Sequence, residues 1–312
     1  MIVLPAALQE RISGLGPGRR QDRRATVWVL LLITQLILAG CSRPPSPSPP
    51  ASPAQTGPGG AIAGNLTQAP ASWWMPPVGT TWQWQLTGLP IDPSVDAELY
   101  DIDLFDNDAA TVAALHAQGY KVICYISAGS WEEWRPDADQ FPESVLGKGY
   151  EGWPGERWLD IRQVDLLAPV MRARLDHCRA KGFDGVEPDN IDGYTNDTGF
   201  PLSYQDQLAY NLWLADEAHA RGLSIGLKND GEQAADLLPH FDWALTEDCF
   251  VQDWCGEMAP FVAAGKAVFA AEYTDELGLD EFRDQVCLQA ASLGFSAILK
   301  NRDLDAARQA CP

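Results

Sequence analysis

One turn recurs four times in the chain, and this repetition constrains the fold more than any other feature. Each copy places a glycine just after a helical pattern and an aromatic or aliphatic residue just after the glycine. The four glycines are Gly119, Gly182, Gly222 and Gly294. Glycine suits the left-handed residue that ends a helix, and the apolar residue suits entry into a buried strand. The sequence therefore predicts a repeated helix-to-strand unit.

Eight runs rich in β-branched and aromatic residues alternate with amphipathic helical patterns. The predicted strands are residues 81–86, 99–105, 121–127, 185–188, 223–228, 243–247, 266–272 and 295–300. The predicted helices are residues 109–118, 165–181, 203–221, 232–238, 257–264, 279–293 and 304–311. This alternation predicts a single (β/α)₈ TIM barrel, an α/β fold, over about 240 residues. An open doubly wound sheet is the alternative, but no GxGxxG motif follows the first strand.

The first 71 residues have the composition of an export signal and a linker. Five arginines precede an apolar stretch that ends in Leu-Ala-Gly-Cys, which is similar to a bacterial lipobox. We expect residues 1–40 to be a lipoprotein signal peptide, Cys41 to carry the lipid, and the Pro/Ser/Gly-rich residues 41–71 to form a tether. The folded domain, 72–312, would then lie outside the cytoplasm, anchored to a bacterial membrane. An ordinary secretory signal, which would give a secreted protein, is the alternative.

The charge of the chain excludes several kinds of partner. There are 43 acidic and 22 basic residues among 312, a formal net charge of −21, and removal of residues 1–40 leaves a net charge of −24. Such a charge argues against binding to nucleic acid and favours a cationic partner. The chain also has 12 Trp, 10 Phe and 8 Tyr, which offer flat apolar surfaces for stacking on sugar rings. Nothing in the sequence indicates an oligomer, and we expect a monomer.

Six cysteines remain after Cys41, and an even number in an exported chain indicates disulfides. Six cysteines allow fifteen pairings; the preferred set is Cys124 with Cys178, Cys249 with Cys255, and Cys287 with Cys311. A zinc site is the competing interpretation. It lacks a CxxC pair and a neighbouring histidine, so we expect no metal and no cofactor.

Carboxylates collect where the predicted strands end, which is the face on which TIM barrels carry their active sites. These residues are Asp101, Asp103, Glu187, Asp189, Glu247 and Glu272. Glu187 and Asp189 are two residues apart, so they point to the same side of their strand. Glu247 reaches the same mouth from two strands further along. Two carboxylates across one cleft are what glycosidic cleavage requires, and Glu187, Asp189 and Glu247 are the candidates for such a pair.

Other rim residues are candidates for contact with a sugar substrate. The predicted substrate-binding residues are Asp101, Asp103, Tyr125, Glu187, Lys228, Asn229, Glu272, Lys300, Trp82 and Trp84. Structural roles compete for most of them. The two aspartates can hold rim loops, Glu187 can tune Asp189, each lysine can be a buried salt-bridge partner, and the tryptophans can be core residues.

Six ordered blocks carry a resemblance to a known family. They are WQWQLTG (82–88), DIDLFDN (101–107), KVICYISAGSWEEWRPD (121–137), GFDGVEPDNIDGY (182–194), LSIGLKND (223–230) and GFSAILKN (294–301). Together they resemble glycoside hydrolase family 114, which includes endo-α-1,4-polygalactosaminidases. The resemblance implies a (β/α)₈ barrel that hydrolyses α-1,4-linked galactosamine polymers. It also implies an acidic pair at the ends of the fourth and sixth strands, here Asp189 and Glu247.

The sequence thus predicts a lipid-anchored endo-acting glycosidase of a cationic amino-sugar polysaccharide. Asp189 is expected to be the nucleophile of a retaining mechanism and Glu247 the general acid/base, with Glu187 and Glu272 as second choices. One alternative is a carbohydrate-binding barrel lipoprotein without catalysis. Another is a metal-dependent phosphodiesterase that uses the rim carboxylates as ligands.

Overall fold

The computed structural model describes residues 73–312. The predicted signal peptide, Cys41 and the tether lie outside the described residues, and their predictions stay predictions. Within the described part, no helix is long and apolar enough to cross a membrane.

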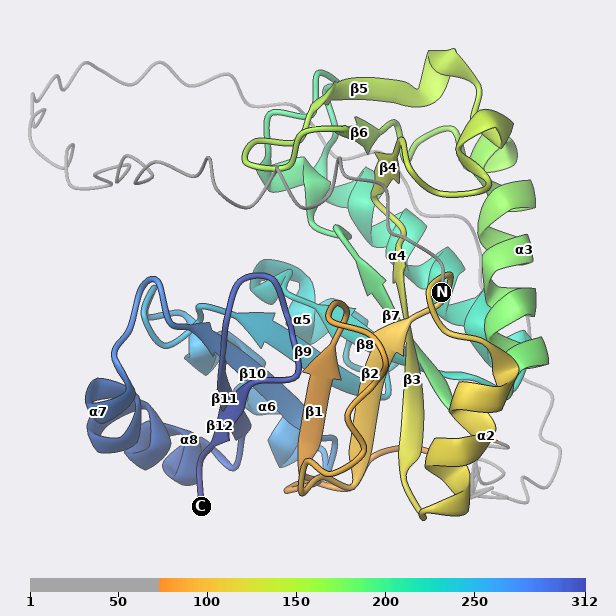
Figure 1. Cartoon of the computed structure of the whole chain (residues 1–312). Coiled ribbons are helices and arrows are strands. Elements are labelled where there is room, and N and C mark those ends of the chain that lie inside the picture. Colours follow the sequence, from red (N-terminus) through yellow and green to blue (C-terminus); the bar gives the residue numbers. More distant parts are fainter. Residues whose placement is uncertain (1–72) are drawn as a thin grey trace, which may run out of the picture. The chain divides into compact units, whose positions relative to one another are not determined.

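Eight parallel strands form a barrel, and each coincides with a strand predicted from the sequence (Figure 1). They are β1 (Trp82–Gln85), β2 (Leu99–Asp103), β3 (Lys121–Ser127), β7 (Gly185–Asp189), β8 (Ser224–Lys228), β9 (Trp243–Glu247), β10 (Val268–Tyr273) and β11 (Ser296–Lys300). They lie side by side in this order, and all the pairings between them are parallel. The predicted (β/α)₈ architecture is confirmed.

Helices cover the outside of the barrel. They are α2 (Ala109–Ala117), α3 (Val164–Lys181), α4 (Tyr204–Ala220), α5 (Ala234–Leu237), α6 (Ala259–Ala263), α7 (Leu279–Glu281) and α8 (Cys287–Leu293), the last two joined by a π-helical turn. The four glycines of the repeated turn all adopt left-handed φ values, between 70° and 95°. The repeated turn predicted from the sequence is therefore present, and it lies at the end of the barrel where the strands begin.

Two separate apolar clusters stabilise this arrangement. One fills the space between strands and helices. The other fills the barrel interior and includes Trp82, Trp84, Trp243 and Phe269, each no more than 1% exposed. Gly226 faces the indole of Trp243, and a Cβ on this glycine would lie 2.3 Å from the ring. Aromatic rings thus fill the barrel interior, and the Trp243 ring fits there because Gly226 of β8 has no side chain.

Three disulfides connect elements of the barrel, and they are the three pairs preferred from the sequence. Cys124–Cys178 joins β3 to α3, Cys249–Cys255 closes the loop after β9, and Cys287–Cys311 joins α8 to the end of the chain.

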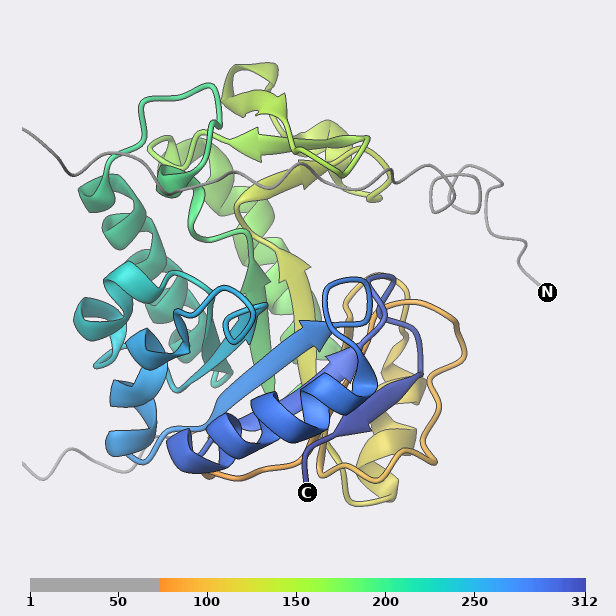
Figure 2. The same ribbon diagram turned by 90° about the vertical axis from the view of Figure 1, so that its left-hand side faces the viewer.

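Two parts of the fold differ from the sequence prediction. Residues 304–311 are not a helix, because β12 (Arg308–Ala310) pairs antiparallel with β11. This segment closes the barrel against β1: the amides of Leu86 and Thr87 donate to the Leu304 carbonyl. A second sheet was not predicted at all. It consists of β4 (Ser130–Glu132), β6 (Glu156–Leu159) and β5 (Leu146–Gly149) and stands at the carboxyl ends of β3 and β7 (Figures 1 and 2).

We predict that Gly226→Ala destabilises the domain by about 1–3 kcal/mol, because the added methyl group overpacks the Trp243 ring. Gly256→Ala is the matched control, since no atom lies within 4 Å of the position that its methyl group would take. Urea unfolding of both variants measures the difference. Equal stability of the two variants would contradict the tight interior packing.

Candidate active site

The candidate active site is built around one buried ammonium group. Lys228, the last residue of β8, is 1% exposed, and its Nζ lies 2.8 Å from Glu187 Oε1, 2.8 Å from Asp189 Oδ1 and 3.2 Å from Glu247 Oε2. The ring of Trp84 packs 4.6 Å from the same nitrogen. One cation therefore connects the ends of β7, β8 and β9 and brings the two predicted catalytic carboxylates together.

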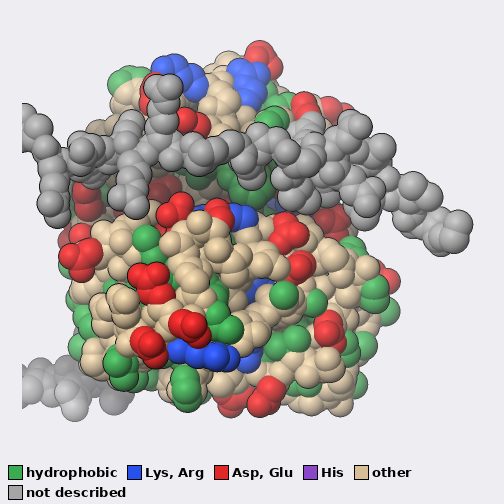
Figure 3. Space-filling view, turned by 60° about the vertical axis from the view of Figure 1, so that its left-hand side comes forward, with side chains coloured by type: hydrophobic (Ala, Val, Ile, Leu, Met, Phe, Trp, Pro, Cys, Tyr) green, Lys and Arg blue, Asp and Glu red, His purple; other side chains and the backbone are tan. Residues whose placement is uncertain are grey.

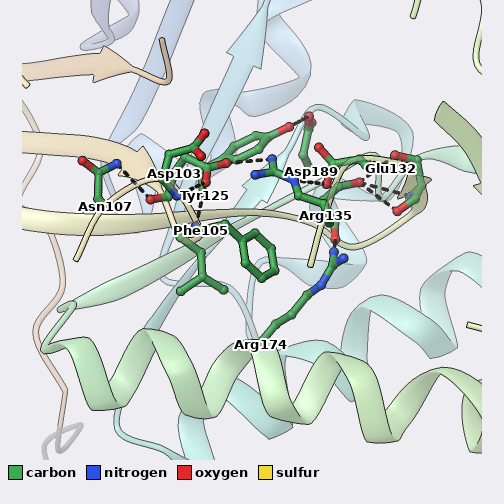
Figure 4. Close-up of polar contacts among 12 residues, drawn as sticks. Asp103, Phe105, Asn107, Tyr125, Glu132, Arg135, Arg174 and Asp189 are labelled. Carbon is green, nitrogen blue, oxygen red and sulfur yellow. Dashed lines mark hydrogen bonds and ion pairs between the residues drawn. The ribbon is translucent and has the colours of Figure 1, made fainter. Parts of the chain in front are cut away.

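Asp189 accepts hydrogen bonds on both carboxylate oxygens. Tyr125 donates its hydroxyl to Oδ2 at 2.9 Å, and the Asn190 amide donates to Oδ1 at 2.9 Å (Figure 4). The side chain of Asp189 is 17% exposed. These donors fix the orientation of the carboxylate while leaving it open to the barrel mouth.

Glu247 is held in the same way from the other side. Tyr273 donates a short hydrogen bond to Oε1, and Asn229 donates to Oε2 at 3.3 Å. The Asn229 carbonyl oxygen also accepts the backbone amide of Glu247. Burial raises the pKa of Glu247, but Lys228, Tyr273 and Asn229 outweigh it, so the pKa lies below its ordinary value. With a side chain that is 26% exposed, Glu247 is the most open member of the group.

Each of these three strands turns sharply directly after its functional residue. Asn190, Asn229 and Asp248 follow Asp189, Lys228 and Glu247, and their φ values are 64°, 52° and 52°. Asn and Asp tolerate this left-handed conformation better than other non-glycine residues. Strained positions of this kind concentrate at functional sites, where they fix the direction of a side chain.

Eight of the predicted substrate-binding residues are buried in the described structure. Trp82, Trp84, Asp101, Asp103, Glu187, Lys228, Glu272 and Lys300 are each no more than 2% exposed. Of the predicted site residues, Tyr125, Asp189, Asn229 and Glu247 are partly exposed. Direct substrate contact of these eight residues stays a prediction, and for several of them the competing structural contacts are present.

The buried residues have protein partners or core positions that explain this. Glu272 points away from the barrel interior because side chains alternate along β10, and Phe269, Ala271 and Tyr273 face inward. Its oxygens accept the Phe250 and Val251 amides. The ammonium of Lys300 donates to the Asp305 carbonyl and to Gln83. The indoles of Trp82 and Trp84 fill the barrel interior.

Asp103 anchors the small sheet to the barrel. Its Oδ1 accepts the amides of Phe105 and Asp106, and its Oδ2 lies 2.7 Å from Arg135. Arg135 also bonds Glu132 of β4, as Figure 4 shows. The Phe105 ring lies 5.1 Å from the Arg135 guanidinium and 5.3 Å from that of Arg174.

The small sheet contributes residues to the site that the sequence analysis missed. Glu156 of β6 accepts the Ser130 hydroxyl, and Asn190 donates its side-chain amide to Ser127 and Ser130. Burial, followed by the charges of Asp189, Asp192 and Glu247, raises the pKa of Tyr150, which directly follows β5. Tyr273 was missed because the strand was ended one residue early, and the alternation of apolar residues along β10 was the signal that could have found it.

The surroundings of the pair are strongly acidic. Burial and the charge of Asp189 raise the pKa of Asp192 to about 6, and burial and the charge of Asp192 raise the pKa of Asp230 to about 9. Figure 3 shows acidic side chains spread over one face of the molecule, with fewer basic ones among them. In the described part of the chain, no group of three or more His, Cys, Asp or Glu residues has the arrangement to hold a metal ion.

Comparison with known proteins identifies the family. The model of glycoside hydrolase family GH114 matches residues 63–312. The chain belongs to glycoside hydrolase family 114. It is a glycoside hydrolase. A solved GH114-like structure, Aspergillus fumigatus Ega3 in complex with galactosamine, is 43% identical, with a TM-score of 0.73, and the match covers 80% of this chain and all of Ega3.

Two matches are more distant, one to a solved structure of the same fold and one to a protein sequence. The glycoside hydrolase domain of PelA from Pseudomonas aeruginosa is 16% identical, with a TM-score of 0.59, over 75% of this chain and 98% of the PelA domain. An uncharacterized protein of Deinococcus radiodurans is 28% identical over 88% of this chain and 97% of its own length.

We predict that the stability of the Glu156→Gln variant falls less with rising pH than the stability of the wild-type GH114 domain does. Burial, followed by the charge of Glu132, raises the pKa of Glu156 to about 8, above its value in the unfolded chain. Its contribution to stability is thus complete below about pH 4 and is lost as the pH rises to about 8. Glutamine cannot lose a proton, so between pH 5 and pH 9 the melting temperature of the variant should rise relative to wild type, by up to about 8–16 °C for the full shift of about three pKa units.

Glu151→Gln is the control for this measurement, because Glu151 is exposed on the turn between β5 and β6. Its melting curve should follow that of the wild type at both pH values. A parallel pH dependence of Glu156→Gln and wild type would contradict the protonation of Glu156.

Proposed function

We propose that this glycoside hydrolase cleaves α-1,4-linked galactosamine-containing polysaccharide within the chain, with Asp189 and Glu247 as its two catalytic carboxylates. The observation that carries the proposal is the shared contact of both carboxylates with Lys228 at a partly exposed barrel mouth. The relation to Ega3, which was solved in complex with galactosamine, supports the choice of sugar.

The separation of the two carboxylates supports a retaining mechanism. Because Asp189 Oδ1 and Glu247 Oε2 contact one nitrogen at 2.8 and 3.2 Å, these oxygens lie within about 6 Å of each other. Retaining glycosidases hold their carboxyl groups about 5–5.5 Å apart, whereas inverting enzymes need about 6.5–9.5 Å to admit a water molecule. In the proposed reaction one carboxylate attacks the anomeric carbon while the other carboxylic acid protonates the leaving oxygen. Water then cleaves the glycosyl-enzyme ester.

Asp189 as nucleophile and Glu247 as acid/base remain the proposed roles. The hydrogen bonds to both oxygens of Asp189 orient it for attack. The lowered pKa of Glu247 favours its ionised form in the free protein, which counts against a role as acid. The assignment within the pair therefore needs a direct chemical test.

A lipid anchor on Cys41 is proposed together with this function, and it would hold the enzyme outside the cytoplasm, on a bacterial membrane.

The two alternatives to this function predict different results. A carbohydrate-binding barrel without catalysis would bind the polymer without producing new reducing ends, and a metal-dependent phosphodiesterase would lose activity in chelator.

We predict that Asp189→Asn and Glu247→Gln each reduce the release of reducing ends from α-1,4-galactosamine polymer at least about 100-fold, since each removes a reacting carboxyl group. Glu151→Gln, with its exposed side chain, is the control and should retain wild-type turnover. Wild-type turnover in either of the two active-site variants would refute the assignment.

Azide addition to the alanine variants at the same positions separates the two roles. With an α-linked substrate, azide replacing the nucleophile yields the β-glycosyl azide, and azide acting after loss of the acid/base yields the α-glycosyl azide. If Asp189→Ala yields the α product and Glu247→Ala the β product, the two roles are reversed.

We predict that activity depends on the positive charge of the substrate. Full N-acetylation removes the ammonium groups and should lower kcat/KM, and salt should lower kcat/KM for the deacetylated polymer because it screens attraction to the acidic mouth. Rates on polymers of graded acetylation, each at low and high ionic strength, provide the measurement. Equal kcat/KM for the acetylated and deacetylated polymers would contradict charge-based recognition.

A further inference from the structure

Asp101 is a carboxyl group enclosed by the barrel and reached by no donor. It lies on β2, is 1% exposed, and among the described residues no hydrogen-bond partner reaches either of its oxygens or Oε2 of Glu187. The two carboxyl groups lie close enough to influence each other's pKa, and a hydrogen bond between them would satisfy an oxygen of each that is otherwise unpaired. A contact between two carboxyl groups is a hydrogen bond only if one of them carries a proton.

The surroundings decide which of the two carries it. Oε1 of Glu187 contacts the Lys228 ammonium at 2.8 Å, whereas Asp101 forms no ion pair in the described structure. The charged groups that act on Asp101 are Glu187 and Asp189 from β7 and Lys228 from β8, so negative charges outnumber positive ones. A buried charge without a partner is far more costly than a buried neutral acid. The negative charge therefore belongs on Glu187 and the proton on Asp101.

We propose that Asp101 is a neutral carboxylic acid that donates a hydrogen bond to Glu187 and thereby positions Lys228 between Asp189 and Glu247. Asp101 is a positioning residue in this arrangement: it acts through Glu187 and Lys228, and it is too buried to touch the substrate. The part of the proposal that concerns the reaction rests on the proposed function, whereas the location of the proton does not.

The electrostatics of the barrel interior agree with this assignment. Burial and then the negative charge of Glu187 raise the pKa of Asp101 well above its ordinary value. Because the folded-state pKa exceeds the unfolded one, the contribution of Asp101 to stability is complete below the unfolded pKa and is lost as the pH rises through the folded value. A carboxylic acid kept neutral by its surroundings can serve as a hydrogen-bond donor at neutral pH.

Two substitutions at this position test the proposal. In Asp101→Asn the amide N–H replaces the acid O–H as donor to Glu187, so kcat should stay within about threefold of wild type. In Asp101→Ala, Glu187 loses its donor and Lys228 its fixed position, and kcat should fall at least about tenfold. If folded Asp101→Asn is as inactive as Asp189→Asn, Asp101 acts as an ionised carboxylate and the proposal is wrong.

Two measurements on the full chain need no substrate. They therefore test the location of the proton even if the proposed substrate of the enzyme is wrong. Wild type at neutral pH should show the infrared C=O stretch of a protonated carboxylic acid, and Asp101→Asn should lack this part of the band. Stability of Asp101→Asn should also fall less with rising pH than that of wild type. An unchanged infrared band in Asp101→Asn overturns the proposal, even if Asp101→Ala fails to fold.

Discussion

The contact of the Lys228 ammonium with three carboxylates is the interaction on which the rest of the site depends. The ammonium is enclosed by the barrel, with the Trp84 ring beside it, and its nearest partners come from β7 and β9. Removal of one partner from a buried ion network leaves an uncompensated charge, which is strongly destabilising. The position of Asp189 relative to Glu247 is therefore set by the barrel core and not by the mobility of surface loops.

Each of the two carboxylates at the mouth is held by its own set of hydrogen-bond donors. Tyr125 and the Asn190 amide hold Asp189, while Tyr273 and Asn229 hold Glu247. The left-handed residues after each strand direct the chain away at once, so that each functional side chain remains at the mouth. The site thus combines a rigid floor with carboxylates that are partly open to solvent, as the proposed reaction requires.

The small sheet of β4, β5 and β6 contacts the site and is attached to the barrel strands that carry it. Arg135 attaches the sheet to Asp103 of β2. Glu156 accepts the Ser130 hydroxyl, and Ser130 accepts the side-chain amide of Asn190, the residue that follows Asp189. Gly129 permits this contact, because a Cβ there would lie 1.6 Å from the Asn190 carbonyl oxygen. Tyr150, which directly follows β5 of this sheet, lies close enough to the mouth for burial and the charges of its acidic residues to raise the Tyr150 pKa.

The sequence by itself determined the eight strands and the left-handed glycine turns, because strand periodicity and helix termination are local properties. It only favoured the three disulfide pairs among fifteen, and the tertiary structure decided them, since Cys124 and Cys178 are 54 residues apart. The sequence also placed Asp189, Lys228 and Glu247 at strand ends that meet at one face. Only the tertiary structure decided which rim residues reach solvent. Trp82, Trp84, Asp103 and Lys300 face protein partners, and the alternation along β10 turns Tyr273 into the barrel and Glu272 out of it. The small sheet and β12 were also decided there, since pairing between short segments depends on neighbours that are distant in the sequence.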